Sequence, residues 1–194
     1  MSNDLKLRPD PAALNALLRQ SECLVDRETM QAAYDRMARE MTATLADACP
    51  VVIVVMTGGL VVAGQLLSRL TFPLEIDYIH VSRYRGTQGG ALNWHVRPTR
   101  DLTGRTVVLV DDLFDQGLTL AAVRGWCQNA GAARTWLAVG ALKQLPARAV
   151  DLLPEFVGVH LPDRFVFGEG LDYDGFFRNL PGIHALPEQT MTQE

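Results

Sequence analysis

The stretch from residue 105 to residue 120 constrains the fold of this chain more than any other part of the sequence. It opens with four consecutive apolar residues at 107–110, the pattern of a strand buried on both faces of a sheet. Three aspartates follow (Asp111, Asp112 and Asp115), and then Gly117, before a helical pattern begins. Open α/β sheets bind ligands at the carboxyl ends of their parallel strands, so this acidic loop is the first candidate for a functional site.

Strands and helices are predicted to alternate along the rest of the chain. Further strands are expected at 51–55, 74–82, 94–97, 135–142 and 156–160. Helices are expected over 11–20, from Asp26 to Pro50, over 60–70 and over 118–130, where Gly131 ends the last one. This alternation predicts one α/β domain with a mostly parallel twisted sheet flanked by helices.

Two of the predicted helices have apolar faces that follow from their spacing. In the helix that begins at Asp26, the residues that recur at helical spacing are Met30, Ala33, Tyr34, Met37, Met41 and Leu45. A methionine-rich face can bind a partner, but packing in the core is the favoured interpretation. In the helix at 60–70, the face expected to be buried comprises Leu60, Ala63, Gly64, Leu67 and Leu70.

Composition excludes several classes of protein. With 22 acidic and 18 basic residues the formal net charge is −4, which argues against a large nucleic-acid-binding surface. No apolar run approaches the roughly 18 residues that a membrane span needs, and the N-terminus lacks the apolar segment of a signal peptide. Three cysteines at unrelated spacings suggest neither a disulfide framework nor a zinc site. We therefore expect a cytoplasmic protein that binds neither nucleic acid nor membrane.

Two glycine-containing loops are further candidates. Gly58 and Gly59 separate the strand at 51–55 from the following helix, and they fit either a tight connection or a backbone cradle for phosphate. The segment 83–93 has three glycines, two arginines and no apolar period. It fits either a mobile lid over a substrate or the tip of a hairpin.

The acidic loop combines acceptors and donors in one place. Asp111, Asp112 and Asp115 can hold Mg²⁺ through water, accept hydrogen bonds from sugar hydroxyls or act as a base. Residues 115–119 offer successive N–H groups and one hydroxyl, which suit a phosphate monoester. A phosphorylated sugar would need both sets of groups, although acidic residues at a helix N-terminus can also be simple caps.

The segment that contains the three aspartates, VVLVDDLFDQGLTL, resembles the phosphoribosyl-pyrophosphate-binding signature of type I phosphoribosyltransferases. Other segments match that family in the same order. MTGG at 56–59 resembles the pyrophosphate loop, SRYRG at 82–86 the mobile catalytic loop, and PDRFVFGEGLDY at 162–173 the purine-binding hood of the hypoxanthine-guanine branch. The resemblance implies a core at about 30–150, a small hood built from about 1–28 and 151–186, and a frayed tail at 187–194.

The resemblance also implies roles for the residues that bind phosphoribosyl pyrophosphate. Asp111 and Asp112 would bind the ribose hydroxyls with Mg²⁺ nearby, and Asp172 would hold a second magnesium ion through water. The 5′-phosphate would be bound by Asp115, Gln116, Gly117, Leu118 and Thr119. The pyrophosphate would be bound by Thr57, Gly58, Gly59 and Arg178.

On the purine side, the resemblance implies that Asp115 is the general base beside the imidazole ring. Lys143 would donate to the 6-oxo group, Phe165 would stack on the base, and Val166 would present backbone atoms to the pyrimidine edge, with Asp172 close by. The lid, with Arg83 and Tyr84, would close the site. The family further implies a homodimer or homotetramer.

Four positions depart from the family pattern. Thr57 stands where lysine is frequent, Gln116 replaces serine or threonine, Asp111 replaces glutamate, and Glu169 stands where tyrosine is frequent. None of them removes the base or the carboxylates implied to hold magnesium. We expect these departures to affect affinity and base preference more than activity.

The function that the resemblance implies is purine salvage: magnesium-dependent transfer of the phosphoribosyl group to hypoxanthine or guanine. A regulatory protein that keeps this fold and binds RNA or a transcription partner is the alternative, and it would be expected to have a basic face. A phosphatase with an aspartate nucleophile ranks last, because the loop has Asp112 and Asp115 three residues apart instead of an Asp-x-Asp motif.

Overall fold

The computed structural model describes residues 10–83 and 92–187, and the larger of the two sheets within them has six strands. In spatial order these are β4 (Leu92–Val96), β3 (Glu75–Arg83), β2 (Val51–Met56), β5 (Thr106–Phe114), β6 (Arg134–Lys143) and β7 (Phe156–Leu161). β4 is antiparallel to β3, and the other neighbours are parallel. The predicted α/β fold with a mostly parallel sheet is confirmed.

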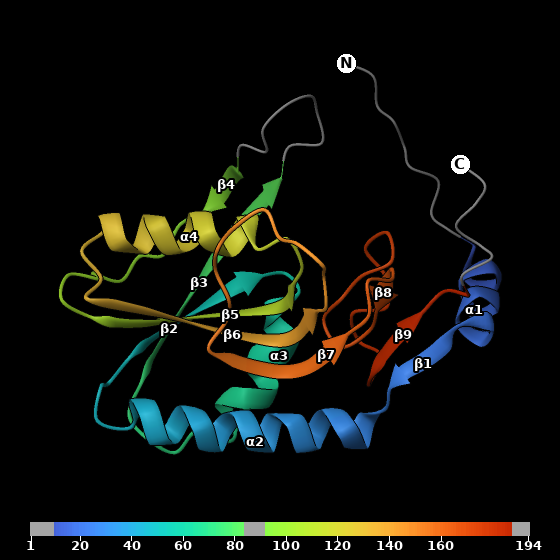
Figure 1. The fold of residues 1–194 in the computed structure, drawn as a ribbon, viewed down its shortest axis with the longest axis horizontal. Coiled ribbons are helices and arrows are strands. Elements are labelled where there is room, and N and C mark those ends of the chain that lie inside the picture. The colour runs from blue at the N-terminus through green and yellow to red at the C-terminus, as the bar shows by residue number, and fades with distance from the viewer. Residues whose placement is uncertain (1–9, 84–91, 188–194) are drawn as a thin grey trace.

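Helices cover both faces of this sheet. α4 (Leu118–Asn129) lies on one face, and α2 (Arg27–Leu45) and α3 (Gly59–Leu67) lie on the other (Figure 1). Alternate residues of β2 pack against the helices on opposite faces of the sheet. Val52 and Val54 pack with α2 and α3, whereas Ile53 packs with α4. Because side chains on a strand alternate between faces, a strand covered on both sides must be apolar throughout, as β2 is.

The helix α2 confirms the predicted apolar face. Met30, Ala33, Tyr34, Met37, Met41 and Leu45 are all buried. Asp26 begins the helix, and its side chain accepts a hydrogen bond from the Thr29 N–H at 2.8 Å. Asp10 caps α1 (Pro11–Gln20) in the same way through the Ala12 N–H. No helix within the described ranges is long and apolar enough to cross a bilayer.

The helix predicted at 60–70 is shorter than expected, and its buried face agrees with the prediction only in part. α3 ends at Leu67, and its buried residues are Gly59, Val62, Ala63 and Leu66. Leu60, expected in the core, is 52% exposed. The predicted face is confirmed at Ala63, which is buried, and at Leu67 and Leu70, which pack against the core. It is wrong at Leu60 and Gly64, because residues 60–67 are apolar almost all round and their spacing does not select one side.

The strand β5 is longer than its apolar residues alone predict. It pairs with β6 as far as Phe114 and Leu142, so Asp111 and Asp112 belong to the strand instead of the loop. Phe114, fully buried, anchors this end of the strand against the core. Pairing with β6 therefore keeps the backbone of Asp111 and Asp112 in a regular strand.

A second, three-stranded sheet forms the hood, which we define as residues 10–25 and 162–187. Its strands lie in the order β1 (Glu22–Val25), β9 (Ile183–Ala185) and β8 (Val166–Phe167), and both pairs are antiparallel. The hood thus combines segments from both ends of the chain, as expected. It stands beyond the arrowheads of β2, β6 and β7 (Figure 1).

Candidate active site

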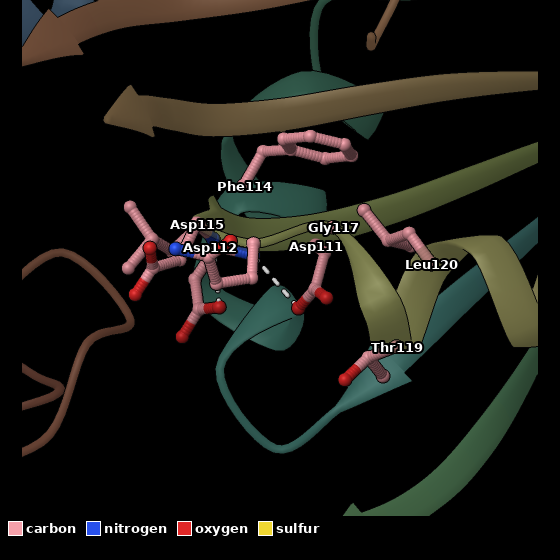
Figure 2. Close-up of a pocket in the computed structure, with 9 residues that line it drawn as sticks. Asp111, Asp112, Phe114, Asp115, Gly117, Thr119 and Leu120 are labelled. Carbon is pink, nitrogen blue, oxygen red and sulfur yellow. Dashed lines mark hydrogen bonds between the residues drawn. The ribbon is translucent and has the colours of Figure 1, made fainter. Parts of the chain in front are cut away.

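The acidic segment lines a cavity of about 370 Å³ at the carboxyl end of β5. The residues around this cavity are Asp111, Asp112, Leu113, Phe114, Asp115, Gln116, Gly117, Thr119 and Leu120. Figure 2 shows the three carboxylates and the Thr119 hydroxyl on one side of the segment and the Phe114 ring on the other. α4 begins directly after Gly117, so the N-terminus of this helix, whose dipole favours an anion, lies at this cavity.

The two adjacent carboxylates on β5 are electrostatically unfavourable. Burial raises the pKa of Asp111 well above its ordinary value, and the charge of Asp112 raises it further. Burial also raises the pKa of Asp112, while the Asp111 hydrogen bond and the Arg178 guanidinium oppose that rise. Such a pair is stabilised by a bound cation or by hydroxyl donors.

Asp111→Asn is therefore expected to raise the melting temperature of the ligand-free protein at pH 7.5 by about 2–4 °C, the shift for roughly 1 kcal/mol in a chain of this size. A carboxyl whose folded-state pKa is raised binds its proton more tightly when folded. Its contribution to stability is therefore lost as pH rises from the unfolded to the folded pKa. The gain from asparagine should shrink towards pH 4.5, as differential scanning calorimetry would show.

Asp101 gives the matched control for that measurement. Its side chain accepts a hydrogen bond from the Thr103 N–H at 3.0 Å, and this bond lowers its pKa. Asp101→Asn should therefore lower the melting temperature at pH 7.5, the opposite sign. An Asp111→Asn protein that melts below the wild type at pH 7.5 would contradict the assigned electrostatic cost.

The loop after β5 is held by packing and by one side-chain hydrogen bond. Gly117 has a φ of +74°, and a Cβ there would lie 2.4 Å from the Phe114 ring and 2.7 Å from Val150. The Gln116 side chain accepts a hydrogen bond from the Ala149 N–H at 3.1 Å. Gln116 thus ties this loop to the segment after β6.

The loop at residues 56–59 lies directly against β5. The Met56–Thr57 peptide bond is cis, and Thr57 is exposed. A Cβ on Gly58 would lie 1.7 Å from Asp112 Oδ2, and one on Gly59 would lie 2.6 Å from the Val110 carbonyl oxygen. The two glycines are therefore required by close approach, and no side chain caps the N-terminus of α3 that follows.

Arg178 joins the hood to β5. Its Nη1 donates to the Gly170 carbonyl oxygen at 2.5 Å and lies 3.4 Å from Asp112 Oδ2, while Nη2 lies 2.6 Å from Asp172 Oδ1. Gly170 itself approaches Gly58, since a Cβ there would lie 2.6 Å from the Gly58 carbonyl oxygen. The predicted pyrophosphate-binding residues 58, 59 and 178 are thus brought together beside Asp112.

Lys143 ends β6 with only 12% of its side chain exposed. Its Nζ lies 3.5 Å from Asp115 Oδ2 and 3.5 Å from Asp163 Oδ1. The structure thus brings the predicted base and the predicted oxo-group donor together. Asp163 had no role in the sequence prediction; its place two residues before Phe165, in the hood motif, was the available signal.

The hood presents an aromatic side chain two residues after Asp163. Phe165 is 41% exposed, and its ring meets Tyr173 edge to face at 5.9 Å between centroids. Val166 is buried within β8, where it pairs with Ala185, so its backbone position is fixed. An exposed aromatic face on a rigid support suits stacking on a flat ring.

Glu169 is a buried carboxylate that sequence analysis had noted only as a departure. It is 5% exposed and has a φ of +52°. Its carboxylate accepts hydrogen bonds from the Tyr34 hydroxyl at 3.1 Å and the Gly182 N–H at 2.9 Å. Glu169 therefore ties the hood to α2, next to the Gly170 turn that touches Gly58.

The predicted magnesium ligands are only partly gathered. Asp111 and Asp112 are neighbours, but the Arg178 guanidinium stands between Asp112 and Asp172. Among residues 10–83 and 92–187, no group of three or more His, Cys, Asp or Glu side chains could hold a metal ion by itself. Of the predicted lid, Arg83 ends β3, and Tyr84 lies outside the described residues.

Comparisons with known proteins show which family this chain belongs to. Residues 21–174 match the model of the phosphoribosyl transferase domain. The chain is 32% identical to a hypoxanthine-guanine-xanthine phosphoribosyltransferase of Tritrichomonas foetus, over 87% of this chain and 93% of that protein. It is 31% identical to a hypoxanthine-guanine phosphoribosyltransferase of Bacillus subtilis, over 84% and 91%.

Solved structures agree as well. A hypoxanthine-guanine-xanthine phosphoribosyltransferase matches with a TM-score of 0.79 at 29% identity, over 86% of this chain and 97% of that one. A Staphylococcus aureus hypoxanthine phosphoribosyltransferase shares the fold, with a TM-score of 0.84 at 23% identity over 96% and 100%. The chain belongs to the phosphoribosyltransferase family. Within that family it falls in the type I, hypoxanthine-guanine branch.

Proposed function

We propose that this protein transfers the 5-phosphoribosyl group of phosphoribosyl pyrophosphate to N9 of hypoxanthine or guanine, giving IMP or GMP and pyrophosphate. The observation that carries the proposal is the position of Asp115: it lines the cavity at the N-terminus of α4 and also pairs with Lys143, 3.5 Å away. One carboxylate thereby stands between a site for a sugar phosphate and a site for an oxo base. The names of the relatives support the same reaction.

On the sugar side, residues 115–119 would hold the 5′-phosphate through backbone N–H groups at the N-terminus of α4, where the helix dipole favours an anion. Asp111 and Asp112 would accept hydrogen bonds from the ribose hydroxyls. Their negative charge would also stabilise the positive charge that develops on the ribose as pyrophosphate leaves. Residues 57–59 and Arg178 would bind the departing pyrophosphate.

On the base side, Lys143 would donate to the 6-oxo group of the purine, and Phe165 would stack on the ring. Asp115 would accept the proton that the imidazole ring loses when N9 forms its new bond. An ammonium donor matches an oxo acceptor and would face the amino group of adenine unfavourably. Val166, fixed in β8, would offer its backbone to the pyrimidine edge.

The residues present fit a magnesium ion bound together with the substrate. Mg²⁺ is usually held by one or two carboxylates together with substrate phosphates and water, and Asp111 and Asp112 supply such a pair. Burial raises the pKa of both groups, and a bound cation would relieve that unfavourable charge. When bound, Mg²⁺ would neutralise the charge of the pyrophosphate leaving group. Asp172 would contribute through water once Arg178 turns towards pyrophosphate.

The lid, the assembly and the location of the protein are proposed from the sequence and from its resemblance to the family. We propose that the lid, with Arg83 and Tyr84, excludes water from the reacting ribose. We further propose that the protein acts in the cytoplasm as a homodimer or homotetramer, without nucleic-acid or membrane partners. Sedimentation equilibrium of the purified protein would give the number of subunits, and a monomer would contradict the proposed assembly.

The activity test uses the purified protein with phosphoribosyl pyrophosphate, Mg²⁺ and one purine at a time. We expect IMP from hypoxanthine and GMP from guanine, and no product from adenine, as measured by liquid chromatography. The absence of nucleotide from hypoxanthine, guanine and xanthine alike would overturn the proposed function. A kcat/KM value for each base would rank the three substrates.

A further inference from the structure

Arg178 makes contacts that binding pyrophosphate would not by itself require. Its guanidinium bridges two carboxylates from different parts of the fold, Asp112 on β5 at 3.4 Å and Asp172 in the hood at 2.6 Å. It also donates to the Gly170 carbonyl oxygen at 2.5 Å. The side chain of Asp112 is 16% exposed and that of Arg178 is 29% exposed, so water screens these charges only in part.

The guanidinium thus lies where a divalent cation bound by the same two carboxylates would have to lie. A cation and Arg178 would compete for Asp112 and Asp172, and they would repel each other at this separation. A phosphate group competes with the two carboxylates for Arg178, because guanidinium binds phosphate oxygens through two parallel hydrogen bonds. Pyrophosphate can therefore draw Arg178 away from the carboxylates.

We propose that Arg178 is a resident counter-ion: it keeps Asp112 and Asp172 from binding a free divalent cation, and it releases them when the pyrophosphate group of the substrate binds. This inference rests on the proposed function, since it assumes that pyrophosphate is bound here. Cation and pyrophosphate then bind with positive cooperativity, and each strengthens the other by the same factor. The metal would enter together with the substrate.

The test measures binding of Mn²⁺ to the ligand-free full-length protein, with free Mn²⁺ followed by electron paramagnetic resonance. Arg178→Gln removes the guanidinium and should tighten Mn²⁺ binding by about tenfold or more, within the usual range of coupling between sites. The double variant Arg178→Gln with Asp172→Asn should lose most of that gain, because one of the released carboxylates is gone. A gain that survives in the double variant would overturn the assignment of Asp172.

Arg100→Gln is the matched control. Arg100 pairs with Glu75 at 3.1 Å on an exposed part of the surface, so its loss changes the net charge equally. If Arg100→Gln tightened Mn²⁺ binding as much as Arg178→Gln, general electrostatics would explain the effect and the proposal would fail. Melting temperatures of all variants would establish that they fold.

Arg178→Lys keeps the positive charge but cannot bridge two carboxylates with a planar fork. It should bind Mn²⁺ more tightly than the wild type and less tightly than Arg178→Gln. Wild-type affinity in both Arg178 variants would overturn the proposal. The titration contains neither purine nor phosphoribosyl pyrophosphate, so its outcome is separate from that of the transferase assay.

Discussion

Asp115→Asn is expected to lower kcat by about 10²-fold or more, within the usual contribution of a general base, while the Kd for phosphoribosyl pyrophosphate changes less than about threefold. Asparagine keeps the shape of the side chain and its hydrogen-bonding oxygen, but it cannot take the purine proton. Steady-state kinetics with hypoxanthine and calorimetric titration with phosphoribosyl pyrophosphate would measure the two quantities. Equal losses in both would show that the role of Asp115 is structural.

Asp163→Asn is the comparison variant for this measurement. Asp163 lies on the other side of Lys143, at the same 3.5 Å from Nζ, and its side chain is 62% exposed. Its replacement removes the same charge from the surroundings of Lys143 but leaves the base in place. We expect the kcat of Asp163→Asn to stay at least about tenfold higher than that of Asp115→Asn. Similar losses in the two variants would mean that charge near Lys143 matters, and not proton transfer by Asp115.

Gly58→Ala is expected to lower kcat/KM for phosphoribosyl pyrophosphate by about 10²-fold, the cost of displacing a reacting group by roughly 1 Å. The backbone of Gly58 has φ −63° and ψ −43°, which alanine adopts readily. The damage is therefore steric, because the new methyl group would lie 1.7 Å from Asp112 Oδ2 and 2.9 Å from Arg178 Nη1. Either the loop or the carboxylate must move. Initial rates at varied phosphoribosyl pyrophosphate would show the loss.

Gly64→Ala is the control on the same helix. A Cβ at Gly64 has nothing within 4 Å, so this substitution adds a methyl group to α3 without a clash. It should leave kcat/KM at the wild-type value and stabilise the helix by up to about 1 kcal/mol. Wild-type kinetics in Gly58→Ala would mean that its contact with Asp112 does not set the geometry of the site.

The central strands β2, β5 and β6 could be predicted because long parts of them are buried on both faces. β2 is apolar at every position through Met56, so no tertiary information was needed to identify it. The helix starts were equally clear, since Asp10 and Asp26 use their side chains as caps. The same logic failed for α3, where an almost uniformly apolar segment leaves the buried face undecided, and for the end of β5, where pairing with β6 carries the strand through Asp111 and Asp112.

The site was predictable only as separate pieces. Residue types suggested the sugar, phosphate and base contacts, but no local pattern places Arg178 beside Asp112, 66 residues away. The hydrogen bond from the Ala149 N–H to Gln116 is likewise invisible in the sequence, since it depends on how the segment after β6 returns. No local sequence pattern predicts the contacts of Glu169 either. Its partners, Tyr34 and Gly182, come from opposite ends of the chain.

The order of strands in the hood has a genetic consequence. β9, at residues 183–185, lies between β1 and β8 and is the only one of the three that pairs with both. A premature stop codon just before Ile183 would leave β8, next to Phe165, without the strand it pairs with. Such a truncation should therefore behave as a null allele, and a selection for loss of purine salvage would recover it.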